Sequence, residues 1–113
     1  MEIVIDGNRY SAELHDNALV KSIVGMSPLD LTMGRSAEHE YYASLPQNPD
    51  ISGAESTSSV KSGGIYYFKD WNALSLNFKD MDISPYHVYV VGEMEKDAAD
   101  YLKAAGSKIK LEV

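Results

Sequence analysis

The sequence contains no cysteine, so disulfide bonds, thiolate metal sites and thiol nucleophiles are excluded. It has no apolar run near the roughly 18 residues that a membrane-spanning helix needs, and it opens on a strand-like pattern in place of a signal peptide. We therefore expect a cytoplasmic protein. Basic residues are also few: 10 Lys and Arg stand against 17 Asp and Glu, a formal net charge of −7. This charge opposes binding to nucleic acid or to anionic membrane surfaces.

The sequence also lacks the recurring motifs of enzymes and metalloproteins. There is no Gly-x-Ser-x-Gly turn, glycine-rich phosphate loop or dinucleotide fingerprint. His15, His39 and His87 are scattered without a His-x-His pair, so we predict neither a metal site nor a cofactor. Because neighbouring side chains diverge on a strand, we expect the adjacent pairs His15-Asp16 and His39-Glu40 to lie on the solvated surface.

What the sequence does contain is enough apolar material for one folded domain. Of its 113 residues, 44% are hydrophobic and 24% are charged, which is typical of a globular chain and not of a disordered one. The length suits a single domain over residues 1–113. No internal repeat or linker divides it.

The first third of the chain predicts a hairpin, a helix and a strand. Two alternating segments flank Asp6-Gly7-Asn8, a step that tolerates the positive φ of a tight turn. Asp16 or Asn17 can then cap a short helix whose apolar stripe ends at Gly25, which we expect to be a left-handed stop. The alternation of Leu29, Leu31 and Met33 predicts a strand ended by Gly34.

The middle of the chain predicts another strand, a long loop and a second hairpin. Residues 41–45 form the strand. Residues 46–64 are rich in Ser, Pro and Gly, which favours a mobile insertion over an interaction or lid segment. Residues 65–69 and 73–78 then flank the turn Asp70-Trp71-Asn72. On the second of these strands Leu74, Leu76 and Phe78 share one face, which places polar Ser75 and Asn77 on the other face.

The last third predicts a strand, a helix and a final strand. Residues 87–94 carry the strongest strand pattern, and residues 96–105 return to helical spacing before Gly106, the expected cap. Residues 109–113 alternate again. Seven or eight strands in so short a chain leave exposed edges unless the sheet closes. We therefore predict a mainly β fold, a closed barrel capped by two short α-helices.

Several short motifs, in their order along the chain, resemble those of cyclophilins and, more closely, of small bacterial and archaeal cyclophilin-like proteins. They are Leu29-Asp30-Leu31-Thr32-Met33, Tyr42-Ala43-Ser44-Leu45-Pro46, Gly64-Ile65-Tyr66-Tyr67, Ser84-Pro85 and Val90-Val91-Gly92-Glu93-Met94. The resemblance covers nearly the whole chain. It implies the cyclophilin-like barrel and, in true cyclophilins, isomerisation of Xaa-Pro bonds.

The resemblance also implies a catalytic arginine on the third strand, but this sequence departs from that pattern. The tripeptide that supplies the arginine is absent, and Arg35 lies beyond Gly34 in an expected turn. His87 precedes the Val90-Val91 strand by one residue too many, and a one-residue slip reverses the face of a strand. We therefore predict a non-catalytic binding or accessory module.

Two alternatives stay open. The first is a weak peptidyl-prolyl isomerase, which requires Arg35 to fold over the barrel face. The second is a small-molecule binder that uses the barrel mouth or groove near Tyr67, Trp71 and His87. Arg35, Tyr67, Trp71 and His87 are thus the candidate ligand-binding residues, for an unidentified small molecule or peptide. We expect Tyr41, Tyr42, Tyr66 and Tyr67 to complete the core more often than to bind a ligand.

Overall fold

The computed structural model describes residues 1–113 and is mainly β. Its helices are α1 (Ala18–Gly25), α2 (Lys96–Ala104) and the 3-10 helix η1 (Lys69–Trp71). Its strands are β1 (Glu2–Ile5), β2 (Asn8–Leu14), β3 (Asp30–Ser36), β4 (Glu40–Ser44), β5 (Ser56–Thr57), β6 (Ser59–Val60), β7 (Gly64–Phe68), β8 (Ala73–Asn77), β9 (Met81–Asp82), β10 (Val88–Met94) and β11 (Lys108–Glu112).

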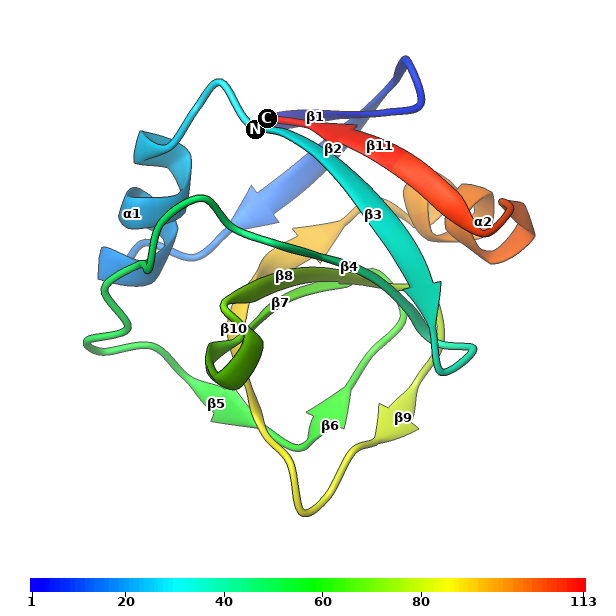
Figure 1. Ribbon diagram of the computed structural model, residues 1–113. Coiled ribbons are helices and arrows are strands. Elements are labelled where there is room, and N and C mark those ends of the chain that lie inside the picture. The colour runs from blue at the N-terminus through cyan, green and yellow to red at the C-terminus, as the bar shows by residue number, and fades with distance from the viewer.

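Eight of these strands close into an antiparallel barrel (Figure 1). Their order is β2-β1-β11-β3-β4-β8-β7-β10, and β10 pairs again with β2 through Gly92↔Leu14 and Met94↔Ala12. Closure leaves no exposed edge within the ring, which is the physical reason for the prediction of a barrel. The closed barrel is thereby confirmed.

The barrel interior and the two helices share one hydrophobic core. The core contains 22 buried residues, and it takes Leu19, Val20 and Ile23 from α1 and Ala98 and Leu102 from α2. The helices lie on opposite sides of the barrel (Figure 1). Their buried residues pack against apolar side chains of the same core. Burying a Leu, Ile or Val side chain contributes about 1.5–3 kcal/mol to the stability of the fold. Neither helix is long and apolar enough to cross a membrane.

The first hairpin is confirmed, and so is one helix cap. Asp6 and Gly7 adopt φ of 50° and 82°, as a tight two-residue turn requires. Asn17 Oδ1 accepts a hydrogen bond from the amide of Val20 at 2.9 Å and begins α1. The structure thus selects Asn17 over Asp16.

The predicted glycine stops are wrong. Gly25 is the last residue of α1, and the cap is Met26 with an ordinary φ of −80°. Helix α2 ends before Ala105, whose φ is −74°, and Gly106 is not left-handed either. In both helices the backbone amide of the cap bonds a carbonyl of the last turn, so no left-handed residue is needed.

The predicted end of the third strand at Gly34 is also wrong. Strand β3 continues to Ser36 because Gly34 pairs with Lys108 of β11 and with Tyr42 of β4. Nothing lies within 4 Å of where a Cβ on Gly34 would be, so this glycine causes no break. Arg35 therefore stands on a strand and not in a turn.

The predicted irregular loop over residues 46–64 is partly ordered into strands. Strand β5 pairs with β10, and β6 pairs with β9 to form a separate two-stranded sheet. These segments cover the outer face of β7 and β10, where Val60, Tyr66 and Val88 form a second, smaller core. Residues 56–60 of this segment thus form a wall against the barrel.

Candidate functional site

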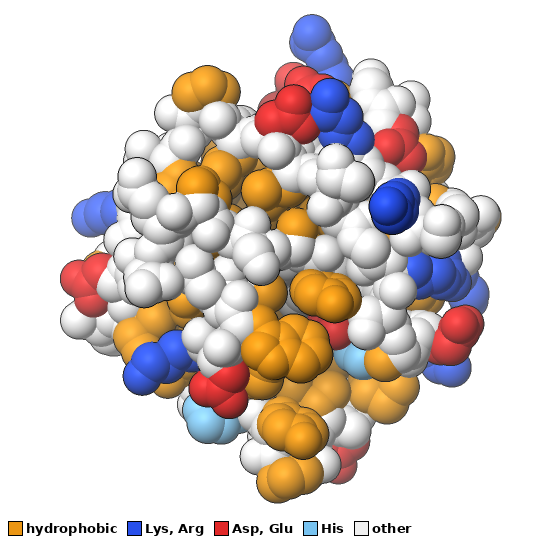
Figure 2. Space-filling view, viewed as in Figure 1, with side chains coloured by type: hydrophobic (Ala, Val, Ile, Leu, Met, Phe, Trp, Pro, Cys, Tyr) orange, Lys and Arg blue, Asp and Glu red, His pale blue; other side chains and the backbone are white.

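A groove lies on the outside of the barrel, between the outward faces of the central strands and the segments that fold over them. Its volume is about 400 Å³. We call it the outer groove, and it is lined by Ser36, Ala37, His39, Glu40, Tyr42, Val60, Phe68, Asp70, Trp71, Ala73, Ser75, Ile83, Tyr86 and Val88. Hydrophobic side chains gather in the lower centre of the face shown in Figure 2, toward the part where Figure 1 shows β6 and the β9–β10 loop.

Alternation along the strands decides which side chains reach this groove. On β4, Tyr41 points into the core while Glu40 and Tyr42 point out, and on β8 Leu74 and Leu76 point in. Outward residues of a barrel strand normally meet water. Here β6 and the segment after β9 lie over them, so the outward face becomes the floor of a groove.

Aromatic rings form one wall of the outer groove. Trp71 lies 5.5 Å from Tyr42 and 5.2 Å from Phe68 between ring centroids, and Phe68 lies 6.4 Å from Tyr86. Phe68 meets both Trp71 and Tyr86 edge to face, at 82° and 88°. Trp71 and Tyr86 are 58% and 63% exposed, which is unusual for side chains of this size.

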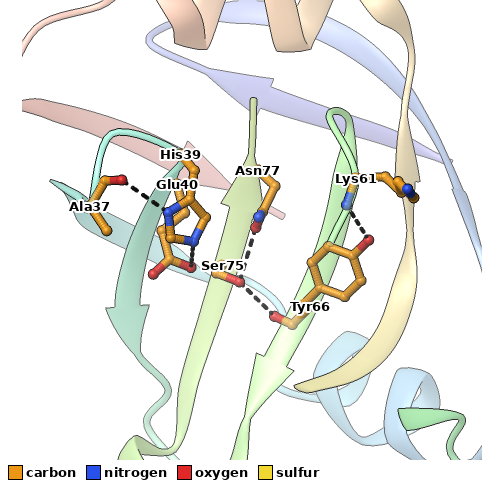
Figure 3. A network of polar contacts seen from close by, with 7 residues as sticks. All are labelled: Ala37, His39, Glu40, Lys61, Tyr66, Ser75 and Asn77. Atoms are coloured by element: carbon orange, nitrogen blue, oxygen red, sulfur yellow. Dashed lines mark hydrogen bonds and ion pairs between the residues drawn. The ribbon is translucent and has the colours of Figure 1, made fainter. Parts of the chain in front are cut away.

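A histidine and a carboxylate lie side by side at the β4 end of the groove (Figure 3). The ring nitrogen Nδ1 of His39 is 3.1 Å from the carbonyl oxygen of Ala37. Because a carbonyl only accepts, Nδ1 carries hydrogen and donates it. The other ring nitrogen, Nε2, faces Oε1 of Glu40 at 3.8 Å. A proton on either partner makes this contact favourable.

Burial raises the pKa of Glu40 above its usual range, and this is the largest effect on that carboxyl. The neighbouring His39 and a hydrogen bond with Ser75 act in the opposite direction and lower the pKa. The Glu40 side chain is only 21% exposed and that of His39 only 9%. The expectation that His39-Glu40 is a solvated pair was therefore wrong, because β4 begins at Glu40 and His39 still belongs to the turn.

Ser75 of β8 belongs to the polar floor of the groove as expected, whereas Asn77 does not line the groove. Both are buried, and Ser75 Oγ lies 3.5 Å from the carbonyl oxygen of Tyr66 and from Oδ1 of Asn77 (Figure 3). Asn77 Nδ2 is buried without a hydrogen-bond partner. A buried amide hydrogen without a partner costs about 1–3 kcal/mol.

Arg35 lies away from this floor, against helix α2. Its guanidinium donates to the carbonyl oxygens of Leu102 and Ala105 at 3.1 Å and of Lys103 at 3.3 Å, and to the hydroxyl of Tyr41 at 3.0 Å. It also lies over the ring of Phe78, with Cζ 4.3 Å from the centroid. Arg35 thus satisfies the free carbonyls at the end of α2.

Tyr67 belongs to the core. It is 2% exposed, and its hydroxyl donates to Oδ1 of Asn72 at 2.6 Å. The amide nitrogen of Asn72 donates to the carbonyl oxygens of Leu45 and Gln47 at 3.1 Å. Tyr67 therefore holds the turn after β7 in place. Burial raises the pKa of its hydroxyl.

Of the four candidate residues, only Trp71 lines the outer groove. His87 is exposed, meets Tyr89 edge to face at 5.9 Å, and lines a neighbouring cavity with Pro85 and Lys69. The four residues are therefore not brought together into one site. The expectation that His87 does not point into the groove agrees with its position, since Val88 is the residue of β10 that lines it.

Comparison with known proteins decides the family. The model of the Cyclophilin-like family matches residues 3–113. The chain belongs to the cyclophilin-like family. This cyclophilin-like chain is also similar to the solution structure of the hypothetical protein AF2241 from Archaeoglobus fulgidus. The TM-score is 0.62 at 19% identity, over 98% of this chain and 91% of that chain, and at this identity the likeness concerns the fold. No curated protein matches significantly.

Analysis of the sequence missed most of the residues that line the groove. Tyr42 and Phe68 fall on the outward positions of their strands, so alternation could have grouped them with Ser75. Tyr86 and Ile83 carried no signal, because nothing in the sequence indicates that their segment folds over β7. Of the four tyrosines assigned to the core, Tyr41, Tyr66 and Tyr67 are buried and Tyr42 lines the groove. No three His, Asp or Glu side chains lie close enough to hold a metal ion.

Proposed function

We propose that this cyclophilin-like chain is a non-catalytic binding or accessory module, and that its outer groove holds a small molecule or a peptide. The observation that carries the proposal is the groove itself. Its volume of about 400 Å³ falls among small-molecule sites, which span about 300–1,000 Å³. Exposed Trp71 and Tyr86 form its rim, and a few polar groups lie at its floor. Apolar walls with few polar groups are typical of binding sites.

The position of Arg35 argues against isomerase activity. Catalysis must favour the twisted prolyl amide over the planar one, across a barrier of about 18–20 kcal/mol. In the family pattern an arginine supplies the hydrogen bond for this step. Arg35 instead donates to the carbonyls of Leu102, Lys103 and Ala105, and no arginine or lysine lines the groove. The alternative of a weak prolyl isomerase therefore has no arginine or lysine donor at the groove.

The carboxylates at the groove also argue against nucleic acid or an anionic membrane surface as the partner. Glu40 and Asp70 line the groove, and phosphate groups would approach them against electrostatic repulsion. The net charge of −7 acts in the same direction over the whole molecule. We therefore propose a ligand that is neither a nucleic acid nor a lipid bilayer.

A chemical-shift screen tests the proposed function. Amide spectra of the labelled protein are recorded with a library of neutral, cationic and anionic small molecules and short peptides. We expect hits to shift the signals of residues 36–42 and the indole signal of Trp71. In the variant Tyr86→Ala the hits should bind more weakly, while His87→Ala, a neighbour outside the groove, should leave them unchanged. Hits that map only to other surfaces, or no hits from the whole library, contradict the proposal.

A further inference from the structure

The charges and rings around the outer groove indicate the chemical class of its ligand. We propose that the groove binds a small organic cation, in which a quaternary or protonated ammonium group sits on a compact apolar body. This inference rests on the proposed function of the groove and deepens it. Two independent features support it, namely the sign of the charged groups and the arrangement of the aromatic rings.

The charged groups of the groove are almost all acidic. Glu40 and Asp70 line it, and no lysine or arginine does. The only residue of the lining that can carry a positive charge is His39, whose Nε2 faces Oε1 of Glu40 at 3.8 Å. Lys69 directly precedes Asp70 in the sequence, but it is exposed and lines the neighbouring cavity, not the outer groove. An entering cation therefore meets favourable charge, and an entering anion meets repulsion.

The aromatic rings are arranged as a corner and not as a stack. Phe68 is nearly perpendicular to both Trp71 and Tyr86, and Tyr42 lies against Trp71 at 43°. Aromatic faces carry partial negative charge, so several rings lining one space attract a cation, and quaternary ammonium groups bind in such surroundings. The exposure of Trp71 and Tyr86 leaves these rings accessible to a ligand.

The carboxylate of Glu40 gives the cation a polar anchor. Its side chain is only 21% exposed, and its one charged neighbour within 4 Å is His39. Burial makes the negative charge of Glu40 costly unless an opposite charge lies close to it. A bound ammonium group would supply that opposite charge. A neutral ligand would remove more water from Glu40 without this compensation. A divalent metal ion does not fit, because no three ligating side chains converge here.

Three probes of nearly the same shape separate charge from shape. They are choline, its neutral carbon isostere 3,3-dimethylbutan-1-ol, and the anion 3,3-dimethylbutanoate. Binding is followed by the amide spectrum and by the fluorescence of Trp71, the single tryptophan of the chain. We expect choline to bind at least about fivefold more tightly than the alcohol, and the anion not to bind.

Two matched variants locate the effect. Glu40→Gln keeps the shape of the side chain and removes its charge, and we expect it to weaken choline at least about fivefold while leaving the alcohol within about twofold. Glu112→Gln removes the same charge from an exposed position on β11 and should leave both unchanged. Far-ultraviolet circular dichroism of each variant confirms that it is folded.

The outcomes separate this inference from the proposed function. If the alcohol or the anion binds the groove as tightly as choline, the groove is a binding site and the cationic class is wrong. If choline binds but Glu40→Gln does not weaken its binding, Glu40 is not the anchor of the cation and the inference is wrong. If none of the three binds while the library screen gives groove hits of other charge, only the present inference falls. If that screen fails as well, the proposed function falls with it.

Discussion

Arg35 has a structural role in this barrel. Its guanidinium reaches three carbonyls at the end of α2, the hydroxyl of Tyr41 and the ring of Phe78. A positive charge at a helix C-terminus is also favoured by the helix dipole. One side chain therefore joins β3, β4 and α2. The same contacts keep the guanidinium away from the outer groove.

We predict that Arg35→Met destabilises the fold by about 2–4 kcal/mol, because hydrogen bonds to charged groups contribute about 1.5–3 kcal/mol each and several share one nitrogen here. Arg35→Lys keeps the charge but not the planar fork, so it should recover part of the loss. Urea denaturation measures the change, and amide exchange should be fastest over residues 102–105. A loss of less than about 0.5 kcal/mol would contradict the structural role.

Glu40 predicts a pH-dependent difference in stability. Burial raises the pKa of Glu40 in the folded state above its unfolded value. A group of this kind favours folding below the unfolded pKa, and the benefit is lost as the pH rises through the folded pKa. The charged form is thus the costly one. Glu40→Gln should therefore be more stable than the wild type near neutral pH.

The same comparison at acid pH provides the control. Below the usual range of a glutamate pKa both side chains are neutral, so the difference between wild type and Glu40→Gln should vanish. Urea denaturation across pH 3–8 measures the difference, and Glu112→Gln, an exposed site, should show little change. A difference that does not depend on pH, or a Glu40→Gln variant that is less stable near neutrality, would show that burial of Glu40 is not the dominant effect.

Among the elements, β10 closes the barrel. It pairs with β7 on one side and with β2 on the other, and its register shifts between Val90 and Gly92. Gly92 lies where the two pairings meet. A Cβ there would overlap the carbonyl oxygen of Glu13 and approach Cα of Leu14 to 2.9 Å. Backbone cannot move aside as a flexible side chain can, so glycine is required by space and not by φ.

Gly92→Ala should accordingly destabilise the protein by about 1–3 kcal/mol, the usual cost of overpacking. The matched control is Gly34→Ala on β3, where nothing lies within 4 Å of the new Cβ. That substitution should be neutral or slightly stabilising. Thermal unfolding of the two variants beside the wild type measures both effects, and equal melting temperatures for all three would refute the role given to Gly92.

The elements also show which local patterns can be read without a structure. Alternation predicted the strands around Ile3, Leu31 and Leu111 because one face of each is buried. Strand β8 also alternates apolar and polar residues, although the structure buries both of its faces. Helix ends were harder, since Gly25 and Gly106 matched the usual stop signal while cap amides satisfied the carbonyls instead. The extension of β3 past Gly34 was missed because pairing with two neighbours outweighs the weak propensity of glycine for strands.

At the scale of the whole molecule, the barrel was predictable and the site was not. Closure follows from many short strands in 113 residues, whatever the details of each. The outer groove instead depends on residues 36–42, 68–75 and 83–88 meeting in space, together with Val60. Only tertiary packing brings such segments together. Trp71 was named because it is the single tryptophan and falls in a predicted hairpin turn. Arg35 and Tyr67 were named as well, but the fold uses both for packing.

The arrangement of the whole molecule agrees with the proposed role of binding without catalysis. The barrel presents a groove on its outer face, while the arginine that could have served that face is tied to the helix at one end. Binding needs only the shape and charge of the groove. Isomerisation needs in addition a donor aimed at the prolyl amide, and the groove contains no arginine or lysine.

Exchange spectroscopy of a short Xaa-Pro peptide tests this account most directly. The cis and trans signals of the peptide interconvert slowly, over tens to hundreds of seconds, without a catalyst. We predict the same rate in the presence of the protein, at any ratio of protein to peptide. An exchange rate that rises in proportion to the protein, and that falls back in Trp71→Ala, would contradict the account.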